Sequence, residues 1–310
     1  MEESKFNEFY RNWRSKLPEL AESYIFDENK KLNPTRYIFS LFRKKIEQFL
    51  TDKLEEVDKI IILPGIRGAG KTTLLMQLFM IEKFLRSNDI NLLSNLNRLN
   101  ERLYIDVSKL KMEGISLNEF FKFYEKAKGF NVISLKEKYL LLLDEVHYDD
   151  NWGLFLKSIF DSTKGHKNIL VIATGSSSIH LKMNPDLSRR VRVEEIFPMK
   201  FNEYLIIKYN KLPIAGLSDE LQNIIFDSKD AKEVYEGLHA KSRDISSFFI
   251  DTPLYAEDDF FEIGGFPYSV RVVNKIRALE LVKNVINNII VKDIIGFEQF
   301  KTQSVAKLNQ

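Results

Sequence analysis

A glycine-rich stretch between an apolar run and an amphipathic run is the feature that most constrains this fold. Residues 63–73 read LPGIRGAGKTT. The residues just before it, IIIL at 60–63, are typical of a buried strand, and residues 71–86 have the pattern of a helix. A strand that turns through glycines into a helix is either a plain connection or a cradle for phosphate groups, and both belong to an α/β core.

The spacing within this stretch favours the cradle, because it satisfies G-x-x-x-x-G-K-[ST]. Glycines let backbone N–H groups approach phosphate oxygens with no Cβ in the way, and the start of the following helix adds its dipole. We predict that Lys71 reaches the β- and γ-phosphates and that the Thr72 hydroxyl ligates Mg²⁺. The predicted nucleotide-binding residues are Gly65, Ile66, Arg67, Gly68, Ala69, Gly70, Lys71, Thr72 and Thr73.

A second motif, YLLLLDE at residues 139–145, predicts a buried strand that ends in two acids. Asp144 would hold the magnesium ion directly or through water, and Glu145 would polarise the attacking water as a catalytic residue. The alternative is a strand that runs into an acidic surface turn. His147 completes the letters DEVH, which resemble a helicase box, but a lone histidine here is more often a surface loop residue.

The run NILVIATG at residues 168–175 predicts the neighbouring strand, with a hydroxyl residue at its end. We predict that Thr174 touches the γ-phosphate or the attacking water, with Ser176 as the second candidate. The alternative is a hydroxyl that only satisfies a turn.

Three arginines lie together in LSRRVRVEE, at positions 189, 190 and 192. One of them could complete the site of a neighbouring subunit and stabilise charge in the transition state. A solvated basic face is equally consistent with the spacing.

The apolar strand runs are continuous and separated by helical segments, which is typical of a parallel sheet with helices on both faces. We predict an N-terminal helical extension over 1–58, a P-loop core over 59–200 and a mostly helical lid domain over 201–310. In the extension, the pattern at 37–57 predicts a helix that starts near Pro34, with Asn33 as its cap. Residues 301–310 resemble the beginning of a helix, so we expect the chain to be truncated before a further module.

Composition excludes several classes of protein. With 44% hydrophobic and 29% charged residues the chain can bury a core, and with no cysteine it has no disulfide or cysteine-based metal site. No apolar signal core or membrane-length run is present, so we predict a cytoplasmic protein with no membrane partner. The net charge of +2 argues against DNA binding as the main task of this segment.

With these motifs identified, the sequence resembles bacterial and archaeal AAA-type ATPases close to the STAND-like branch of P-loop proteins. The resemblance covers about residues 60 to 295 and includes, in order, LPGIRGAGKTTLL, YLLLLDEVHYDDNW, VIATGSSS, LSRR with EEIFPMKFNEYL, and FEIGGFP. It implies an ATP-binding AAA-type core, a helical lid and a C-terminal winged-helix-like region. Arg190 falls where the family pattern has a candidate finger arginine, although Arg189 occupies the preceding position, where a small residue is expected.

The favoured function is therefore an AAA-type switch or motor that binds ATP and hydrolyses it with Mg²⁺. The family and the absence of an N-K-x-D motif favour adenine over guanine. Beyond ATP and ADP, the expected partners are further copies of the chain and a DNA or protein client. The alternatives are a nucleotide-gated DNA-binding or regulatory module with little turnover, using a basic face built from Arg43, Lys44, Lys45 and Arg189 to Arg192, and a small-molecule kinase.

Overall fold

The computed structural model describes residues 3–86, 89–129, 137–175, 187, 189–212, 214–250 and 252–290. Two candidates from the sequence, Ser176 and the helix expected at 301–310, lie outside the described residues. The chain divides into two compact units: one runs to Pro198 and also contains the segment from Val285, and the other is Met199–Asn284.

A five-stranded parallel sheet forms the centre of the first unit, in the order β2-β3-β4-β1-β5. The strands are β1 (Ile60–Pro64), β2 (Leu99–Asp106), β3 (Lys138–Asp144), β4 (Ile169–Gly175) and β5 (Arg192–Val193). The P-loop strand β1 pairs with β4 on one side and with β5 on the other. The predicted α/β fold class with a parallel sheet is confirmed.

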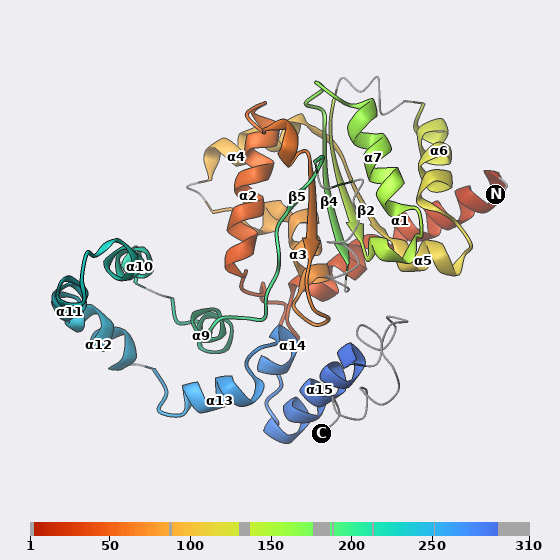
Figure 1. Ribbon diagram of the computed structural model, residues 1–310. Helices are drawn as coiled ribbons and strands as arrows, with labels where there is room; N and C mark the ends of the chain where they lie inside the picture. The colour runs from red at the N-terminus through yellow and green to blue at the C-terminus, as the bar shows by residue number, and fades with distance from the viewer. Residues whose placement is uncertain are drawn as a thin grey trace, which may run out of the picture. The chain divides into compact units, whose positions relative to one another are not determined.

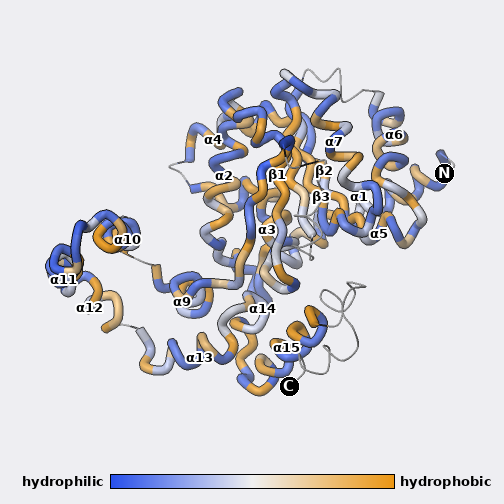
Figure 2. The backbone as a smooth tube through the Cα atoms, viewed as in Figure 1, coloured by the Kyte–Doolittle hydropathy of each residue, from blue (hydrophilic) through white to orange (hydrophobic). Residues whose placement is uncertain are grey.

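The strands are continuous apolar runs because helices cover both faces of the sheet. Helices α2 (Tyr37–Leu50) and α3 (Lys71–Phe79) lie on one side, and α6 (Leu117–Lys128) and α7 (Trp152–Ser162) lie on the other (Figure 1). Every residue of β1 and β4 is buried. The colouring of Figure 2 shows the hydrophobic strands between helices with hydrophilic outer faces.

The first helix, α1 (Glu3–Ile25), was not predicted as one element, and it belongs to the same unit as the sheet. It contacts both α3 and α6, which lie on opposite faces, so it crosses the open edge of the sheet beside β2. Its buried residues fall mostly four apart, on one face of the helix: Phe6, Trp13, Leu17, Ala21 and Ile25.

The start of α2 differs from the prediction. The residue that caps it is Arg36, and the Asn33 side chain donates instead to the carbonyl oxygen of Tyr24 at 2.9 Å. The helix also ends at Leu50, earlier than the periodicity indicated. Asn33 was therefore the wrong cap, because it is used to tie the chain back to the end of α1.

Short helices complete the connections of the first unit: α4 (Ile90–Asn95) before β2 and α5 (Val107–Met112) after it. Helix α6 begins with a capping box, in which Ser116 and Glu119 each accept from the other's backbone N–H. Its C-cap is Gly129, with φ of 70°. These local signals define the bounds of α6 at both ends.

The second unit is helical, as predicted for the C-terminal region. Its helices are α9 (Phe201–Tyr209), α10 (Leu217–Asp227), α11 (Ala231–Ala240), α12 (Ser242–Ile250), α13 (Ala256–Ile263), α14 (Pro267–Val270) and α15 (Lys275–Asn288), of which α15 passes the boundary of the unit. A small core forms around Tyr204 and Leu205 of α9 with Ala256 and Val270. Among the described helices of both units, none is long and apolar enough to cross a membrane.

Candidate functional site

The loop that joins β1 to α3 has the backbone of a phosphate cradle. Gly68 and Gly70 have φ of 83° and 93°, values that side-chain-bearing residues rarely adopt. Gly70 is the residue before the first turn of α3, so the loop leads directly into a helix N-terminus with free N–H groups. Thr72 and Thr73 lie half-buried in that first turn. The glycine spacing therefore produces the turn that the motif predicted.

Gly65 is required for a second reason that the sequence did not reveal. A Cβ at this position would lie 2.4 Å from Cγ2 of Ile196 and 2.5 Å from its carbonyl oxygen. The backbone at Ile196 runs alongside, pairs with Gly65 and donates to the Pro64 oxygen at 2.9 Å. The first glycine of the motif thus allows the chain after β5 to pack against the start of the loop.

Lys71 is buried, and its ammonium group is held inside the loop. Nζ donates to the carbonyl oxygens of Gly65 at 2.8 Å and Ile66 at 2.9 Å. The side chain therefore folds back over the loop from the first residue of α3. This is the position from which a lysine can contact phosphate groups held by the loop N–H groups.

Asp144 ends β3 with its carboxylate fully buried among hydroxyl groups. Tyr104 donates to Oδ2 at 2.9 Å and Thr174 donates to Oδ1, and the Thr72 hydroxyl lies close enough to act on the pKa of the carboxyl group. Burial raises the pKa of Asp144 above its usual value, and the three hydroxyls act in the opposite direction. The hydrogen bonds from Tyr104 and Thr174 stabilise the ionised form of this buried carboxyl group.

Glu145 follows in a strained left-handed conformation, with φ of 53°. Its backbone N–H donates to Thr174 Oγ1 at 3.2 Å, and its carboxylate lies 3.4 Å from Nδ1 of His147. A left-handed residue directly after a strand turns the chain sharply, so the two acids are held in different directions. His147, expected as a surface residue, is mostly buried and contacts the predicted catalytic acid.

The Thr174 hydroxyl connects the two acids. It donates to the Asp144 carboxylate and accepts from the backbone of Glu145, and the side chain is fully buried at the end of β4. In this arrangement it holds the Asp144 carboxylate and the backbone of Glu145. A direct contact of Thr174 with phosphate or water stays a prediction.

The residues present suit a magnesium ion. Mg²⁺ prefers oxygen ligands and is usually held by one or two side chains together with phosphate oxygens. Asp144 and Thr72 supply such oxygens beside the loop. Within the described ranges, no three His, Cys, Asp or Glu side chains come together, so a cage made only of protein ligands is not present there.

The comparison with protein families agrees with this geometry. Residues 57–205 match the family model described as an AAA domain. The resemblance to AAA-type P-loop proteins is therefore confirmed for the segment that contains the sheet, the loop and the two acids.

Curated relatives extend the similarity beyond the AAA domain. The chain is 29% identical over 306 residues to uncharacterized protein MJ1637 of Methanocaldococcus jannaschii, a match that covers 98% of this chain and 56% of the relative. It is 22% identical over 246 residues to an uncharacterized protein of Haemophilus influenzae, covering 78% and 48%. The chain thus spans about half the length of these relatives.

Among solved structures, PCH-2 of C. elegans is similar over 94% of this chain and 70% of its own, with 16% identity and a TM-score of 0.41. A likeness at this level does not bear on function. The fold assignment depends on the strand order and the loop of the AAA domain itself.

Arg36 contacts the phosphate loop from outside the matched segment, and no sequence pattern predicted this contact. Its guanidinium donates to the carbonyl oxygens of Ala69 at 2.7 Å and Pro198 at 3.4 Å. The residue before α2 thus ties the phosphate loop to the end of the first unit. Arg67, the other arginine at the loop, is half-buried within it.

The three arginines near β5 lie away from the loop in the same chain. Because Arg192 pairs in parallel with Ile61, Arg190 lies near the amino ends of the strands, whereas the loop follows their carboxyl ends. Arg190 Nε donates to Asp161 of α7 at 2.9 Å, and Arg192 Nε donates to Glu194 at 2.7 Å. In the same chain, Arg190 therefore lies toward the opposite end of the strands from the phosphate loop.

Four of the six basic residues named for a DNA-binding face form ion pairs with acids of the first unit: Arg43, Lys45, Arg190 and Arg192. Arg43 forms an ion pair with Asp89, and Lys45 lies 2.5 Å from Asp58. Together with the acid partners of Arg190 and Arg192, these pairs leave little free positive charge at the four positions. Counterion release, which drives DNA binding, depends on such free charge.

Proposed function

We propose that the chain is an ATP-binding AAA-type protein that hydrolyses ATP with Mg²⁺ and acts as a switch or motor. The observation that carries this proposal is the Asp144 carboxylate, buried at the end of β3, held by the hydroxyls of Tyr104 and Thr174 and lying near the Thr72 hydroxyl of the phosphate loop. A buried carboxylate costs stability, so its retention favours a role in which a cation compensates that cost.

Each residue of the site has a task in this proposal. The loop N–H groups and Lys71 bind the phosphates, while Thr72 and Asp144 hold the metal ion. Glu145 accepts a hydrogen bond from the attacking water and orients it toward the γ-phosphate. Thr174 orients Asp144 and the backbone of Glu145. Magnesium, when bound, neutralises charge on the β- and γ-phosphate oxygens.

Hydrolysis by one copy with help from another is part of the proposal. Arg190 would leave its ion pair with Asp161 and approach the γ-phosphate bound by a neighbouring copy. This requires an oligomer, so the rate per chain should rise with protein concentration. A rate independent of concentration would argue against a finger supplied in trans.

The test is ATP binding and hydrolysis with Mg²⁺ for the wild type, Lys71→Ala and Glu145→Gln. Glu145→Gln should bind ATP with wild-type affinity and lose turnover by about 100-fold or more, since a general base contributes 10²–10⁴. Lys71→Ala should lose ATP affinity.

Asp150→Asn is the matched control, because this carboxylate lies on the same loop after β3 with its side chain 87% exposed. It should behave as the wild type. Tight binding with no turnover in the wild type would instead support the nucleotide-gated regulatory module, and absence of ATP binding would overturn the proposal.

A further inference from the structure

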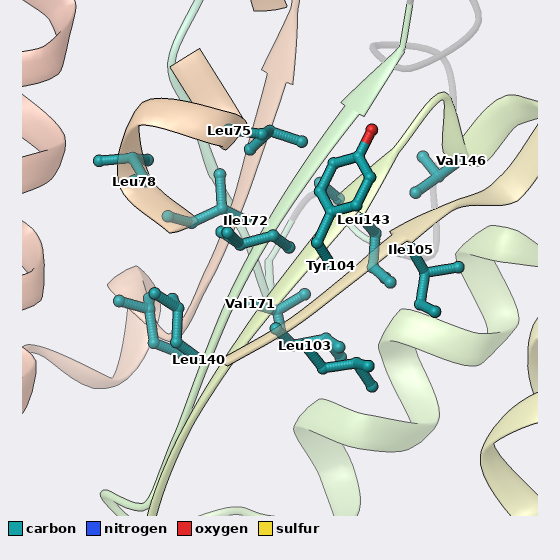
Figure 3. Close-up of a cluster of buried hydrophobic side chains, with 14 of the residues drawn as sticks. Leu75, Leu78, Leu103, Tyr104, Ile105, Leu140, Leu143, Val146, Val171 and Ile172 are labelled. Atoms are coloured by element: carbon teal, nitrogen blue, oxygen red, sulfur yellow. The ribbon is translucent and has the colours of Figure 1, made fainter. Parts of the chain in front are cut away.

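Tyr104 is a buried residue of the edge strand β2 that reaches the predicted metal carboxylate. It pairs with Leu142 of β3, two positions before Asp106 pairs with Asp144, so its side chain must extend along the sheet to the strand ends. Figure 3 shows the ring among the core side chains near Leu75 and Val146, with the hydroxyl pointing toward the carboxyl ends of the strands. Its hydroxyl donates to Asp144 Oδ2 at 2.9 Å.

The tyrosine hydroxyl matters for the geometry of the carboxylate. Thr174 donates to Oδ1 and Tyr104 donates to Oδ2, so both oxygens are held and rotation of the group is restricted. A phenylalanine would fill the same apolar space without burying a hydroxyl. Because burying a hydroxyl costs free energy unless it is hydrogen-bonded, the contact with Asp144 accounts for a tyrosine at this position.

The position of Tyr104 is in turn held by helix α1 through Trp13. The two rings stack with centroids 5.9 Å apart and an interplanar angle of 14°. The indole Nε1 donates to the Tyr104 carbonyl oxygen at 2.9 Å, which gives the edge strand a partner outside the sheet. The ammonium group of Lys109 in α5 lies over the Trp13 ring, with Nζ 4.8 Å from the ring centroid.

We propose that Tyr104 is a positioning residue for the magnesium-binding carboxylate, and that helix α1 sets its position through Trp13. The N-terminal helix, which lies outside the matched AAA domain, would then tune the metal affinity of the site. The step from α1 to the metal passes through two contacts, the Trp13–Tyr104 stack and the Tyr104–Asp144 hydrogen bond. This inference rests on the proposed function, because it needs nucleotide and Mg²⁺ to bind.

The experiment compares the wild type with Tyr104→Phe in two measurements. The first is ATP affinity by calorimetry in excess EDTA. The second is the Mg²⁺ concentration at which the metal site of the ATP-bound protein is half-saturated. The variant keeps the ring and its stack and removes only the hydroxyl. ATP affinity in EDTA should change by less than about twofold, because the phosphate loop is intact. The half-saturating Mg²⁺ concentration should rise about threefold to tenfold, which corresponds to the net contribution of one typical hydrogen bond.

Tyr124→Phe is the matched control, since Tyr124 is an equally buried tyrosine in α6 that does not contact Asp144. It should leave the Mg²⁺ requirement unchanged. Trp13→Phe, which removes the indole N–H and keeps an aromatic ring, should shift the Mg²⁺ requirement in the same direction as Tyr104→Phe by a smaller factor. If Tyr104→Phe does not fold, the shift measured for Trp13→Phe tests the inference in its place.

Binding of Mn²⁺ in the presence of ADP, followed by electron paramagnetic resonance, gives a readout independent of turnover. The spectrum of the bound ion should change in Tyr104→Phe and not in Tyr124→Phe. An unchanged Mg²⁺ requirement and spectrum in Tyr104→Phe would overturn the inference while leaving the proposed function intact. A wild type that binds no ATP, with EDTA or with Mg²⁺, would overturn both.

Discussion

Replacement of Gly65 by alanine tests whether the close approach of Ile196 determines the first glycine of the loop. The added Cβ would lie 2.4 Å from a side-chain carbon and 2.5 Å from a backbone oxygen, against about 3.4–4 Å for an ordinary contact. Either the segment at Gly65 or the segment at Ile196 must therefore move by about 1 Å. Overpacking of this kind costs about 1–3 kcal/mol.

The assay combines thermal unfolding with calorimetry of ATP binding. The melting temperature should fall by about 2–4 °C for each kcal/mol lost. ATP affinity should also fall, because the displaced segment is the start of the phosphate loop. Gly129→Ala is the control: Gly129 has φ of 70° and open space around it, so alanine costs about 1–2 kcal/mol of backbone strain far from the loop.

Combining Gly65→Ala with Ile196→Ala separates the two contacts. Truncating Ile196 removes the Cγ2 contact but leaves its carbonyl oxygen in place, so Gly65→Ala should cost less stability and ATP affinity in the Ile196→Ala background than in the wild type, but still a measurable amount. No cost of Gly65→Ala in that background would show that only the side chain excludes a Cβ. A single Gly65→Ala variant with wild-type stability and ATP affinity would refute the reasoning altogether.

Three further predictions follow from other parts of the first unit. Burial raises the pKa of Asp144, so the stability that this carboxyl group contributes is present below its ordinary pKa and is lost as pH rises through the folded value. Asp144→Asn should therefore raise the free energy of unfolding without metal at pH 7 by about 0.5–2 kcal/mol, measured in urea. The same variant should abolish stabilisation by Mg²⁺ with ATP. A less stable Asp144→Asn protein would contradict this. Ser116→Ala should lower stability by about 1 kcal/mol through loss of the α6 cap, measured against the exposed Ser94→Ala as a control. Arg190→Ala and Glu145→Gln should each be inactive alone and recover ATPase activity when mixed, and a mixture without activity would exclude Arg190 as a finger acting in trans.

Much of the fold could be predicted from the sequence because the deciding patterns are local. The strand, glycine turn and helix around Lys71 are contiguous, and the apolar run before Asp144 specifies a buried strand by itself. The motif spacing also identified the two acids and the loop residues that the structure brings to the carboxyl ends of β1 and β3. Apolar residues that lie mostly four apart were present in α1 as well, but Pro18 lies within that helix, where a proline is unfavourable.

The tertiary structure alone decided which distant residues support these motifs. The order of the strands puts Tyr104 beside Asp144, the crossing of α1 over the sheet edge puts Trp13 on Tyr104, and the start of α2 puts Arg36 on the phosphate loop. Each of these contacts joins residues far apart in the chain, and a hydrogen bond between them leaves no periodicity or spacing in the sequence. Local patterns determine where elements form, whereas packing of the elements determines which side chains meet.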